Sequence, residues 1–383
     1  MHCYAEKKEC GVMQTYIEIN LKNIKKNLLI LKRSLSKGVD ILLVVKAEAY
    51  GHGMLAVAKY AEDTGLVQAL GVTTADEALS LRKHRIKLPI ITMQPVFKDE
   101  VEALIRKKIT LTLSSVEEAA WVQSKAKQLN RRALVHAGID TGMGRLGIDK
   151  KDALKFIFDL SKMTNIDLRG MYSHFPMAEV TSAESLTQRQ IKVIQMIAEL
   201  YRDLNPKKPF QVHMANSAAI MSAKLPALDM IRPGIAAFGI ADPSLNQGRG
   251  FRPVLVLKTN IGLIKWIDEG QTISYACTYK TKTRTRVAII PIGYSNGYPL
   301  ALSNVGEVLI KGRRHPIIGR VTMDFTMIDI GVNEKIKTGD PVVLIGRSGS
   351  EEITVNELAQ KAKTIPYDIV CALSNQIPRI YKQ

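Results

Sequence analysis

The chain has 383 residues, 46% of them hydrophobic and 23% charged, and a formal net charge of +18 at pH 7. This composition excludes a disordered or fibrous protein, and the length allows one large barrel with a companion domain. No apolar run reaches the roughly 18 residues that a membrane span needs, and residues 1–14 lack the apolar core of a signal peptide. We therefore expect a soluble, cytoplasmic protein with an N-terminal tail over residues 1–14.

The cysteines and the charge give only weak functional signals. Cys3, Cys10, Cys277 and Cys371 show neither metal-ligand spacing nor a disulfide pattern, so no metal site is expected. The charge peaks in KTKTRTR (280–286), where Lys and Arg alternate with threonine and so share one face of a strand. A solvated strand face explains this run most simply. Because no zinc pattern or RNA-binding signature accompanies the charge, we do not expect nucleic acid as a partner.

Short apolar runs alternate with amphipathic helical stretches from about residue 40 to 240, which predicts parallel strands joined by helices. The expected strands are Ile41–Lys46, Ala69–Val72, Pro89–Met93, Ile109–Leu113, Leu134–Ile139, Leu168–His174, Phe210–Met214 and Met230–Arg232. This number of strand–helix units favours an α/β fold of the closed (β/α)8 TIM type over an open parallel sheet. The chemistry of such a barrel lies at the C-terminal ends of its strands.

The pattern changes after Phe251 to short β-branched segments separated by glycines. The expected strands there are Val254–Thr259, Arg286–Ile292, Glu307–Ile310, Arg314–Ile318, Thr326–Ile330 and Pro341–Ile345. The sequence therefore predicts a barrel over residues 15–250 followed by a smaller all-β domain over residues 251–383. One more strand, Thr15–Asn20, precedes the first helix.

One lysine stands at the end of the first barrel strand. In VVKAEAYGHG (44–53), Lys46 follows an aliphatic run, and Gly51 and Gly53 interrupt the pattern after Tyr50. A lysine at such a point suits aldehyde chemistry, although a snorkelling surface lysine would give the same pattern. Four further stretches bear on this choice: HAGIDTGMGRLGI (136–148), MYSHF (171–175), HMANSAAI with IRPGIAAFG (213–220 and 231–239), and ISYACTY with GRVTMD (273–279 and 319–324).

Together, in this order, these stretches resemble the alanine racemase family, barrel enzymes that use pyridoxal 5'-phosphate (PLP), over nearly the whole chain after residue 14. The resemblance implies that Lys46 forms the Schiff base with PLP and then serves as the base for the D-enantiomer. It implies that Tyr275 is the second acid–base group, on the opposite face of the substrate, and that it reaches in from the other subunit of a homodimer with shared active sites. It also implies that Thr15–Asn20 joins the C-terminal domain.

The remaining site residues are also implied by the resemblance. Asn216, Ser217, Tyr50 and the backbone around Gly234 would bind the cofactor, largely through its phosphate. His174, which also borders the cofactor, and Arg145, which also meets the substrate, would favour the ionised form of Tyr275.

Arg232 would face the pyridine nitrogen. Because arginine only donates hydrogen bonds, it would leave that nitrogen unprotonated and make the ring a weaker electron sink. His213 would support Arg232. The Met323 backbone amide, from the partner subunit, would help to hold the substrate carboxylate, and Asp324 would orient that loop.

Several positions depart from the commoner family pattern. Gly138 replaces the family's carbamylated lysine, so Arg145 must be positioned otherwise, for example by a bound anion such as chloride. Glu48, Thr322 and Leu300 replace a usual asparagine, cysteine and arginine. Asn375 stands where a tyrosine often borders the substrate methyl group, and asparagine offers both room and a partner for a serine hydroxyl.

The resulting prediction is an amino-acid racemase that acts on alanine, and also on serine, and supplies D-amino acids for cell-wall precursors. The alternative is a dedicated serine racemase of the type linked to vancomycin resistance, in which the catalytic part follows a membrane domain. Membrane proximity would suit the basic charge. Three other classes fit less well: a PLP-binding homeostasis protein, which lacks the β domain; a barrel-type decarboxylase; and a nucleic-acid-binding module.

Overall fold

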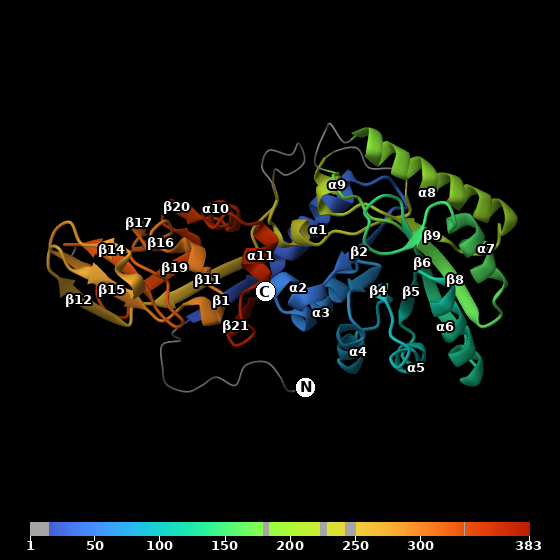
Figure 1. The fold of residues 1–383 in the computed structure, drawn as a ribbon, viewed down its shortest axis with the longest axis horizontal. Helices are drawn as coiled ribbons and strands as arrows, with labels where there is room; N and C mark the ends of the chain where they lie inside the picture. The colour runs from blue at the N-terminus through green and yellow to red at the C-terminus, as the bar shows by residue number, and fades with distance from the viewer. Residues whose placement is uncertain (1–14, 179–183, 223–227, 242–249, 333) are drawn as a thin grey trace. The chain divides into compact units, whose positions relative to one another are not determined.

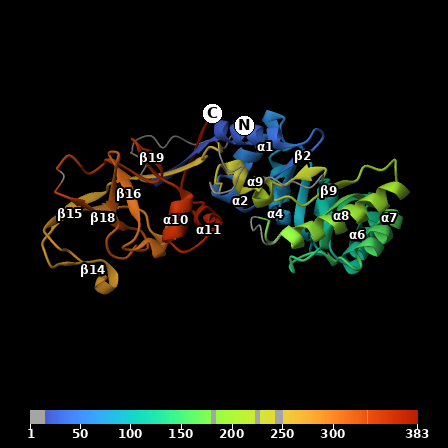
Figure 2. The same cartoon turned by 90° about the horizontal axis from the view of Figure 1, so that it is seen from above.

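The computed structural model describes residues 15–178, 184–222, 228–241, 250–332 and 334–383. The expected N-terminal tail, with Cys3 and Cys10, lies outside these residues. The chain forms two compact units: Lys22–Arg252, and the segment up to Leu21 together with Pro253–Gln383. Figures 1 and 2 show helices on the outside of the strands in the first unit and mainly strands in the second.

The first unit is a closed parallel barrel. Its strands are β2 (Asp40–Val44), β3 (Ala69–Val72), β4 (Ile90–Pro95), β5 (Thr110–Leu113), β6 (Ala133–Asp140), β8 (Ile166–Tyr172), β9 (Gln211–His213) and β10 (Met230–Ile231). They pair in the order β5-β4-β3-β2-β10-β9-β8-β6, and β6 pairs with β5 again, which closes the barrel. A short strand, β7 (Ile148–Asp149), pairs with β6. The predicted (β/α)8 barrel is confirmed.

Helices connect the barrel strands. They are α1 (Leu21–Ser34), α2 (Lys46–Gly51), α3 (Met54–Thr64), α4 (Ala75–Lys83), α5 (Val101–Arg106), α6 (Val116–Gln128), α7 (Ala153–Lys162), α8 (Glu184–Leu204) and α9 (Ser217–Met221). Helix α4 begins with a capping box between Thr74 and Glu77, and Ser115 caps α6 by accepting a hydrogen bond from Glu118 N. These caps fix where the helices start, immediately after the carboxyl ends of β3 and β5.

The barrel strands are buried on both faces, which explains their continuous aliphatic runs. Leu42, Leu43, Leu70 and Leu111 are fully buried, and every residue of β3 and β5 is buried. Gly71 is needed for this packing, since a Cβ there would lie 2.5 Å from Leu42 Cδ2. The aliphatic core therefore holds the strand ends, and the residues just beyond them, in fixed positions.

The second unit contains one larger sheet and two smaller ones. In the larger sheet β17-β16-β19-β11-β1-β21 lie in that order, with β20 paired to β19. A sheet β12-β15-β18 and a pair β13-β14 complete it. The strands are β1 (Thr15–Asn20), β11 (Leu255–Asn260), β12 (Leu263–Ile267), β13 (Thr272–Ile273), β14 (Tyr279–Lys280), β15 (Thr285–Ile290), β16 (Glu307–Ile310), β17 (Arg313–Pro316), β18 (Thr326–Gly331), β19 (Pro341–Ser348), β20 (Glu351–Ile353) and β21 (Arg379–Lys382).

Strand β1 lies between two strands from the other end of the chain. It pairs antiparallel with β11 and parallel with β21. Its Glu18 forms ion pairs with Lys258 at 3.1 Å and Lys382 at 2.8 Å. Two short helices, α10 (Val355–Lys361) and α11 (Pro366–Cys371), also belong to this predominantly β unit.

The basic run 280–286 is solvated, but the prediction of a single strand is wrong, because residues 281–284 lie between β14 and β15. Thr281 and Thr285 are buried, while Thr283 is exposed together with Lys282 and Arg284. Arg284 pairs with Asp268 at 3.2 Å and lies over the Trp266 ring. Across the described residues, no helix is both long enough and apolar enough to cross a bilayer.

Candidate active site

Lys46 lies two residues beyond the end of β2, at the start of an unusual turn. The next four residues, Ala47, Glu48, Ala49 and Tyr50, have φ values of 50°, 53°, 51° and 56°, so the backbone makes a left-handed helical turn. Each non-glycine residue in this conformation costs roughly 1–2 kcal/mol. Such strain persists only where surrounding contacts enforce it, and it commonly marks a functional segment.

Several hydrogen bonds hold this left-handed turn. Ala47 N donates to Glu77 Oε1 at 2.7 Å, and Met54 N donates to Glu48 Oε2 at 3.0 Å. His52 is fully buried, and its Nδ1 lies 2.9 Å from Ala49 O and 2.8 Å from Tyr50 O. Carbonyl oxygens only accept hydrogen bonds, so Nδ1 carries the proton. The sequence analysis missed His52, although it stands between the two glycines of the first motif.

Tyr50, Ser217 and Gly234 form a compact cradle. A Cβ on Gly234 would lie 2.4 Å from Tyr50 Oη, so only glycine fits at that position. Ser217 is buried, and its Oγ accepts hydrogen bonds from Gly234 N at 3.0 Å and Ala236 N at 3.2 Å. The hydroxyl proton of Ser217 is then left to donate. This close backbone approach and directed hydroxyl suit the phosphate of a cofactor.

Asn216 has a structural role beside this cradle. Its Oδ1 accepts a hydrogen bond from Ala219 N at 3.0 Å and so caps α9, while its Nδ2 donates to Phe175 O at 3.4 Å. The first bond fixes the start of α9, where Ser217 lies. The cradle is also tied to the lysine strand, because Val44 N donates to Pro233 O at 2.9 Å.

Arg232 is a buried cation that is fixed by carbonyl and imidazole groups. Its Nη1 donates to His213 O at 2.8 Å, and its Nη2 donates to Ser173 O at 2.8 Å and Met214 O at 3.1 Å. Burial lowers the pKa of Arg232 to about 10, which leaves it charged at neutral pH. Among the described residues, no acceptor meets its Nε–H, so this donor can serve a ligand such as the pyridine nitrogen.

The imidazoles around Arg232 must be neutral, with defined tautomers. His213 Nδ1 lies 3.0 Å and His174 Nδ1 3.1 Å from the guanidinium, and both must accept because arginine only donates. His213 therefore carries its proton on Nε2, which donates to His136 Nδ1 at 2.9 Å. Burial, reinforced by Arg232, holds the pKa of His213 well below its ordinary value. His136, which the sequence analysis did not select, is the last residue of this hydrogen-bonded series from Arg232 through His213.

The charges of Lys46 and Arg145 act on His174. Burial, followed by the charges of Arg232, Arg145 and Lys46, lowers the pKa of His174 to about 3. These groups therefore belong to one site at the carboxyl ends of the barrel strands. His174 follows β8 and is neutral there at physiological pH.

Arg145 is exposed on a loop that wraps around one carboxylate. Asp140 Oδ1 accepts hydrogen bonds from Gly142 N at 2.8 Å and Met143 N at 2.9 Å, and Oδ2 accepts one from Arg145 N at 3.1 Å. Burial opposes ionisation of Asp140, but these backbone donors outweigh it and lower its pKa. Asp140, another residue that the sequence analysis passed over, thus fixes the backbone that carries Arg145.

The space beside Gly138 is already occupied. A Cβ on Gly138 would lie 3.0 Å from Ser114 Oγ and 3.2 Å from Thr112 Cγ2. A longer side chain at this position would require both neighbours to move. The packing of β5 and the residue after it against β6 therefore fills the space that a lysine side chain at position 138 would need.

The other predicted site residues belong to the β unit. Tyr275 is 70% exposed, and Met323 is 53% exposed. Backbone strain marks the Tyr275 loop, because Ser274 and Ala276 have φ values of 65° and 59°. Asn375 is exposed between α11 and β21.

The Met323 loop is fixed through Ser295. Ser295 Oγ lies 2.8 Å from Met323 O and 2.9 Å from Asp324 Oδ1, so its single hydroxyl proton is shared between the two acceptors and links both residues to Ser295. Gly293 is also needed, because a Cβ there would lie 2.4 Å from Met323 O.

Comparison with known proteins identifies the family. Residues 19–242 match the model of the alanine racemase N-terminal domain, and residues 254–381 match that of the C-terminal domain. The alanine racemase of Symbiobacterium thermophilum is 38% identical over 373 residues, covering 97% of this chain and 98% of its own. That of Halothermothrix orenii is 38% identical over 370 residues, covering 96% and 97%.

Solved structures agree with these sequence matches. The alanine racemase of Clostridium difficile 630 has a TM-score of 0.89 at 35% identity, covering 97% of each chain. That of Bartonella henselae, which holds covalently bound pyridoxal phosphate, has a TM-score of 0.84 at 26% identity, covering 97% of this chain and 100% of its own. Both domain matches, the curated relatives and these structures agree over nearly the whole length, and the chain belongs to the alanine racemase family, whose members depend on pyridoxal phosphate.

Proposed function

We propose that this chain interconverts L- and D-alanine with pyridoxal phosphate by a two-base mechanism. The observation that carries the proposal is the buried Arg232, whose guanidinium is held by two neutral imidazoles while its Nε–H is left for a ligand. Lys46 and the cradle of Tyr50, Ser217 and Gly234 lie at the same end of the barrel.

The residues of the barrel fit the cofactor group by group. Lys46 Nζ would hold the aldehyde carbon, the cradle would hold the phosphate, and Arg232 would donate to the pyridine nitrogen. Bound pyridoxal phosphate supplies an electron sink that makes the substrate α-proton removable. Because Arg232 stays charged at neutral pH and only donates, it would leave the pyridine nitrogen unprotonated and the sink moderate. A moderate sink favours reprotonation over side reactions such as transamination.

Racemisation requires a proton to leave one face of the α-carbon and another to arrive on the opposite face. In the proposal, Lys46 Nζ exchanges the proton of the D-enantiomer and Tyr275 Oη that of the L-enantiomer. Arg145 and the Met323 backbone amide meet the substrate carboxylate. Tyr275 and Met323 would come from a second copy of the chain, and the large exposed fraction of both side chains in the single chain supports such a homodimer.

The substitution Tyr275→Phe tests the two-base assignment. It should nearly abolish racemisation without releasing the cofactor, since it removes only one of the two acid–base groups. Solvent deuterium should still enter D-alanine through Lys46, while entry into L-alanine is lost. Tyr60→Phe, on α3, is the matched control and should keep wild-type rates. Equal loss of exchange for both enantiomers would contradict the assignment.

A second activity, on serine, is proposed from Asn375. An asparagine at this exposed loop position offers a donor and an acceptor for the serine hydroxyl, whereas alanine still fits because its side chain is smaller. Asn375→Tyr should lower kcat/KM for serine more than for alanine. If a buried hydrogen bond is lost, the difference in transition-state stabilisation between the two substrates should be about 1–3 kcal/mol. Equal effects on the two substrates would show that Asn375 matters only for cofactor placement, and the chain would then be an ordinary alanine racemase.

The biological role that we propose is the supply of D-alanine for cell-wall precursors in the cytoplasm. Expression of the chain should therefore rescue growth of a bacterium that requires added D-alanine, and Lys46→Ala should not. Failure of the wild-type chain to rescue, at normal expression and in vitro activity, would count against this role.

A further inference from the structure

The amino-terminal end of the barrel carries positive charge that nearby carboxylates do not balance. Three successive connections lead into neighbouring strands there: residues 82–88 into β4, 106–108 into β5 and 127–132 into β6. Their sequences, RKHRIKL, RKK and KQLNRR, contain no aspartate or glutamate. Since β4, β5 and β6 are adjacent in the barrel, the three segments form one surface, which we call the basic face.

Hydrogen bonds between the connections fix the basic face. Arg82 Nε donates to Lys107 O at 3.2 Å and joins the first segment to the second. Arg131 Nη1 donates to Arg106 O at 3.2 Å and joins the third segment to the second. The basic face is therefore a continuous surface rather than three independent loops.

Most cations of the basic face are available to a partner. Those that are exposed and make no ion pair within the described part of the chain are Lys83, Arg85, Lys87, Lys107, Lys108, Lys127 and Arg131. Arg106 pairs with Glu102 at 2.9 Å, and Arg132 lies 4.0 Å from Asp167.

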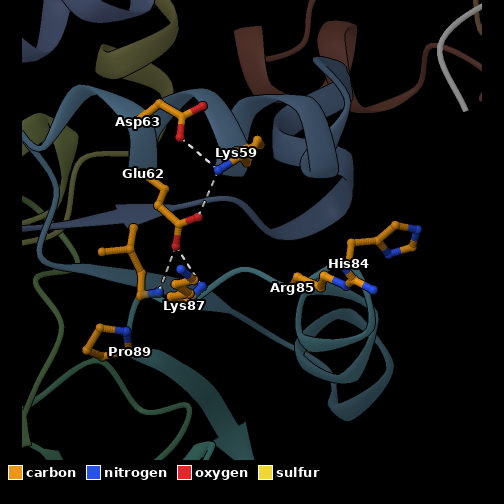
Figure 3. Close-up of a pocket in the computed structure, with 8 residues that line it drawn as sticks. Lys59, Glu62, Asp63, His84, Arg85, Lys87 and Pro89 are labelled. Atoms are coloured by element: carbon orange, nitrogen blue, oxygen red, sulfur yellow. Dashed lines mark hydrogen bonds and ion pairs between the residues drawn. The ribbon is translucent and has the colours of Figure 1, made fainter. Parts of the chain in front are cut away.

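The carboxylates next to the basic face already have partners (Figure 3). Glu62 Oε1 accepts hydrogen bonds from Lys87 N at 2.6 Å and Leu88 N at 3.0 Å, and Lys59 pairs with both Glu62 and Asp63. These groups line an open cavity of about 680 Å³ that Arg85 also borders. In Figure 3 no dashed line joins Arg85 to another of the residues drawn.

Helix dipoles account for only part of this charge. A cation stabilises a helix within its last turn, but α4, α5 and α6 end at Lys83, Arg106 and Gln128. Other cations of the basic face follow these ends: Arg85, Lys87, Lys107, Lys108, Arg131 and Arg132. The first turns of the same helices, at the opposite end of the barrel, hold acidic residues and no counterpart of this basic cluster.

We propose that the basic face docks the protein on an anionic lipid bilayer. The cations are spread over three adjacent loops, which matches a planar array of headgroup charges. The three segments contain no Phe, Tyr or Trp, so the face lacks the stacking platform that single-stranded nucleic acid binding uses. Without exposed apolar anchors in these segments, attraction is electrostatic and reversible. Lys46, at the other end of the barrel, then faces away from the bilayer.

Cosedimentation of the holoenzyme with lipid vesicles tests the proposal. Binding to vesicles that contain phosphatidylglycerol should exceed binding to pure phosphatidylcholine vesicles, and it should disappear at about 1 M salt, where the screening length falls to roughly 3 Å. Each cation near an anionic surface strengthens binding about fivefold. The triple substitution Lys83→Gln, Lys87→Gln and Lys107→Gln should thus weaken binding on the order of 100-fold, with racemase activity in solution unchanged.

A matched triple substitution separates the basic face from net charge. Lys98→Gln, Lys150→Gln and Lys151→Gln remove the same charge from exposed positions near the opposite end of the barrel and should weaken binding far less. The proposal fails if both triples lose equal binding, or if wild type does not prefer the anionic vesicles. Tighter binding to RNA or DNA than to vesicles, abolished by the first triple, would overturn it in favour of nucleic acid.

Discussion

The left-handed turn after Lys46 predicts an unusual response to glycine. Ala47 has a φ of 50° and is exposed, so its methyl group contributes strain and little packing. Ala47→Gly should relieve roughly 1–2 kcal/mol of backbone strain. The added freedom of the unfolded chain costs about 0.5–1 kcal/mol. The expected net change therefore runs from about zero to about 1.5 kcal/mol of stabilisation.

The control for this prediction is Ala120→Gly, at an exposed position within α6. There glycine should cost about 1 kcal/mol, because it replaces the best helix former. In thermal unfolding of the holoenzyme, Ala120→Gly should lower Tm by about 2–4 °C, while Ala47→Gly should leave Tm unchanged or raise it. An equal fall in Tm for both variants would refute the account of strain. The turnover number of Ala47→Gly should fall, because the strained turn no longer fixes the direction of Lys46.

Two further predictions concern the cofactor cradle and the buried imidazoles. Gly234→Ala places a Cβ 2.4 Å from Tyr50 Oη, so the dissociation constant of pyridoxal phosphate, measured by absorbance, should rise by about 5- to 150-fold. The control Gly262→Ala, whose Cβ would lie 3.5 Å from the nearest atom, should leave this constant unchanged. Burial lowers the pKa of His136 and of His174 to about 3, below the ordinary 6.5, so below pH 6.5 the unfolded chain binds protons that the folded chain does not. The free energy of unfolding should therefore fall as pH drops from about 6.5 towards 3, by up to about 1.4 kcal/mol per pH unit for each histidine. A urea midpoint that stays constant between pH 7 and pH 5 would show that these imidazoles are protonated in the folded protein.

The barrel could be predicted because its strands are continuous aliphatic runs that no solvated face interrupts. Leu42 and Leu43 are fully buried on opposite faces of β2, and this double burial is visible in the sequence. The strand ends were less predictable. Strand β2 ends at Val44 rather than at Lys46, ahead of the left-handed turn over residues 47–50, whose φ values follow from distant contacts such as Glu77 with Ala47 N.

The candidate site was only partly predictable from the sequence. Arg232, His213 and His174 were selected through motifs, and the structure places them in one hydrogen-bonded group. His136 and His52 were not selected, because a buried histidine carries no sign of its partner in the sequence. His136 bonds to a residue 77 positions away, and the ring of His52 stacks on that of Phe238, with centroids 4.4 Å apart. The strand β12 was also missed, since exposed Leu263 and Trp266 break the alternation expected of a half-buried strand.

Strand β1 has a consequence for how the chain folds during synthesis. The hydroxyl of Thr15 hydrogen-bonds to that of Thr259, 244 positions later, so β1 stays unpaired until the whole barrel has been synthesised. Loop closure over such a distance costs little extra stability, but it delays the contact. An unpaired strand can join other chains in the meantime. The charge of Glu18, in the middle of β1, discourages such association until Lys258 and Lys382 arrive to neutralise it.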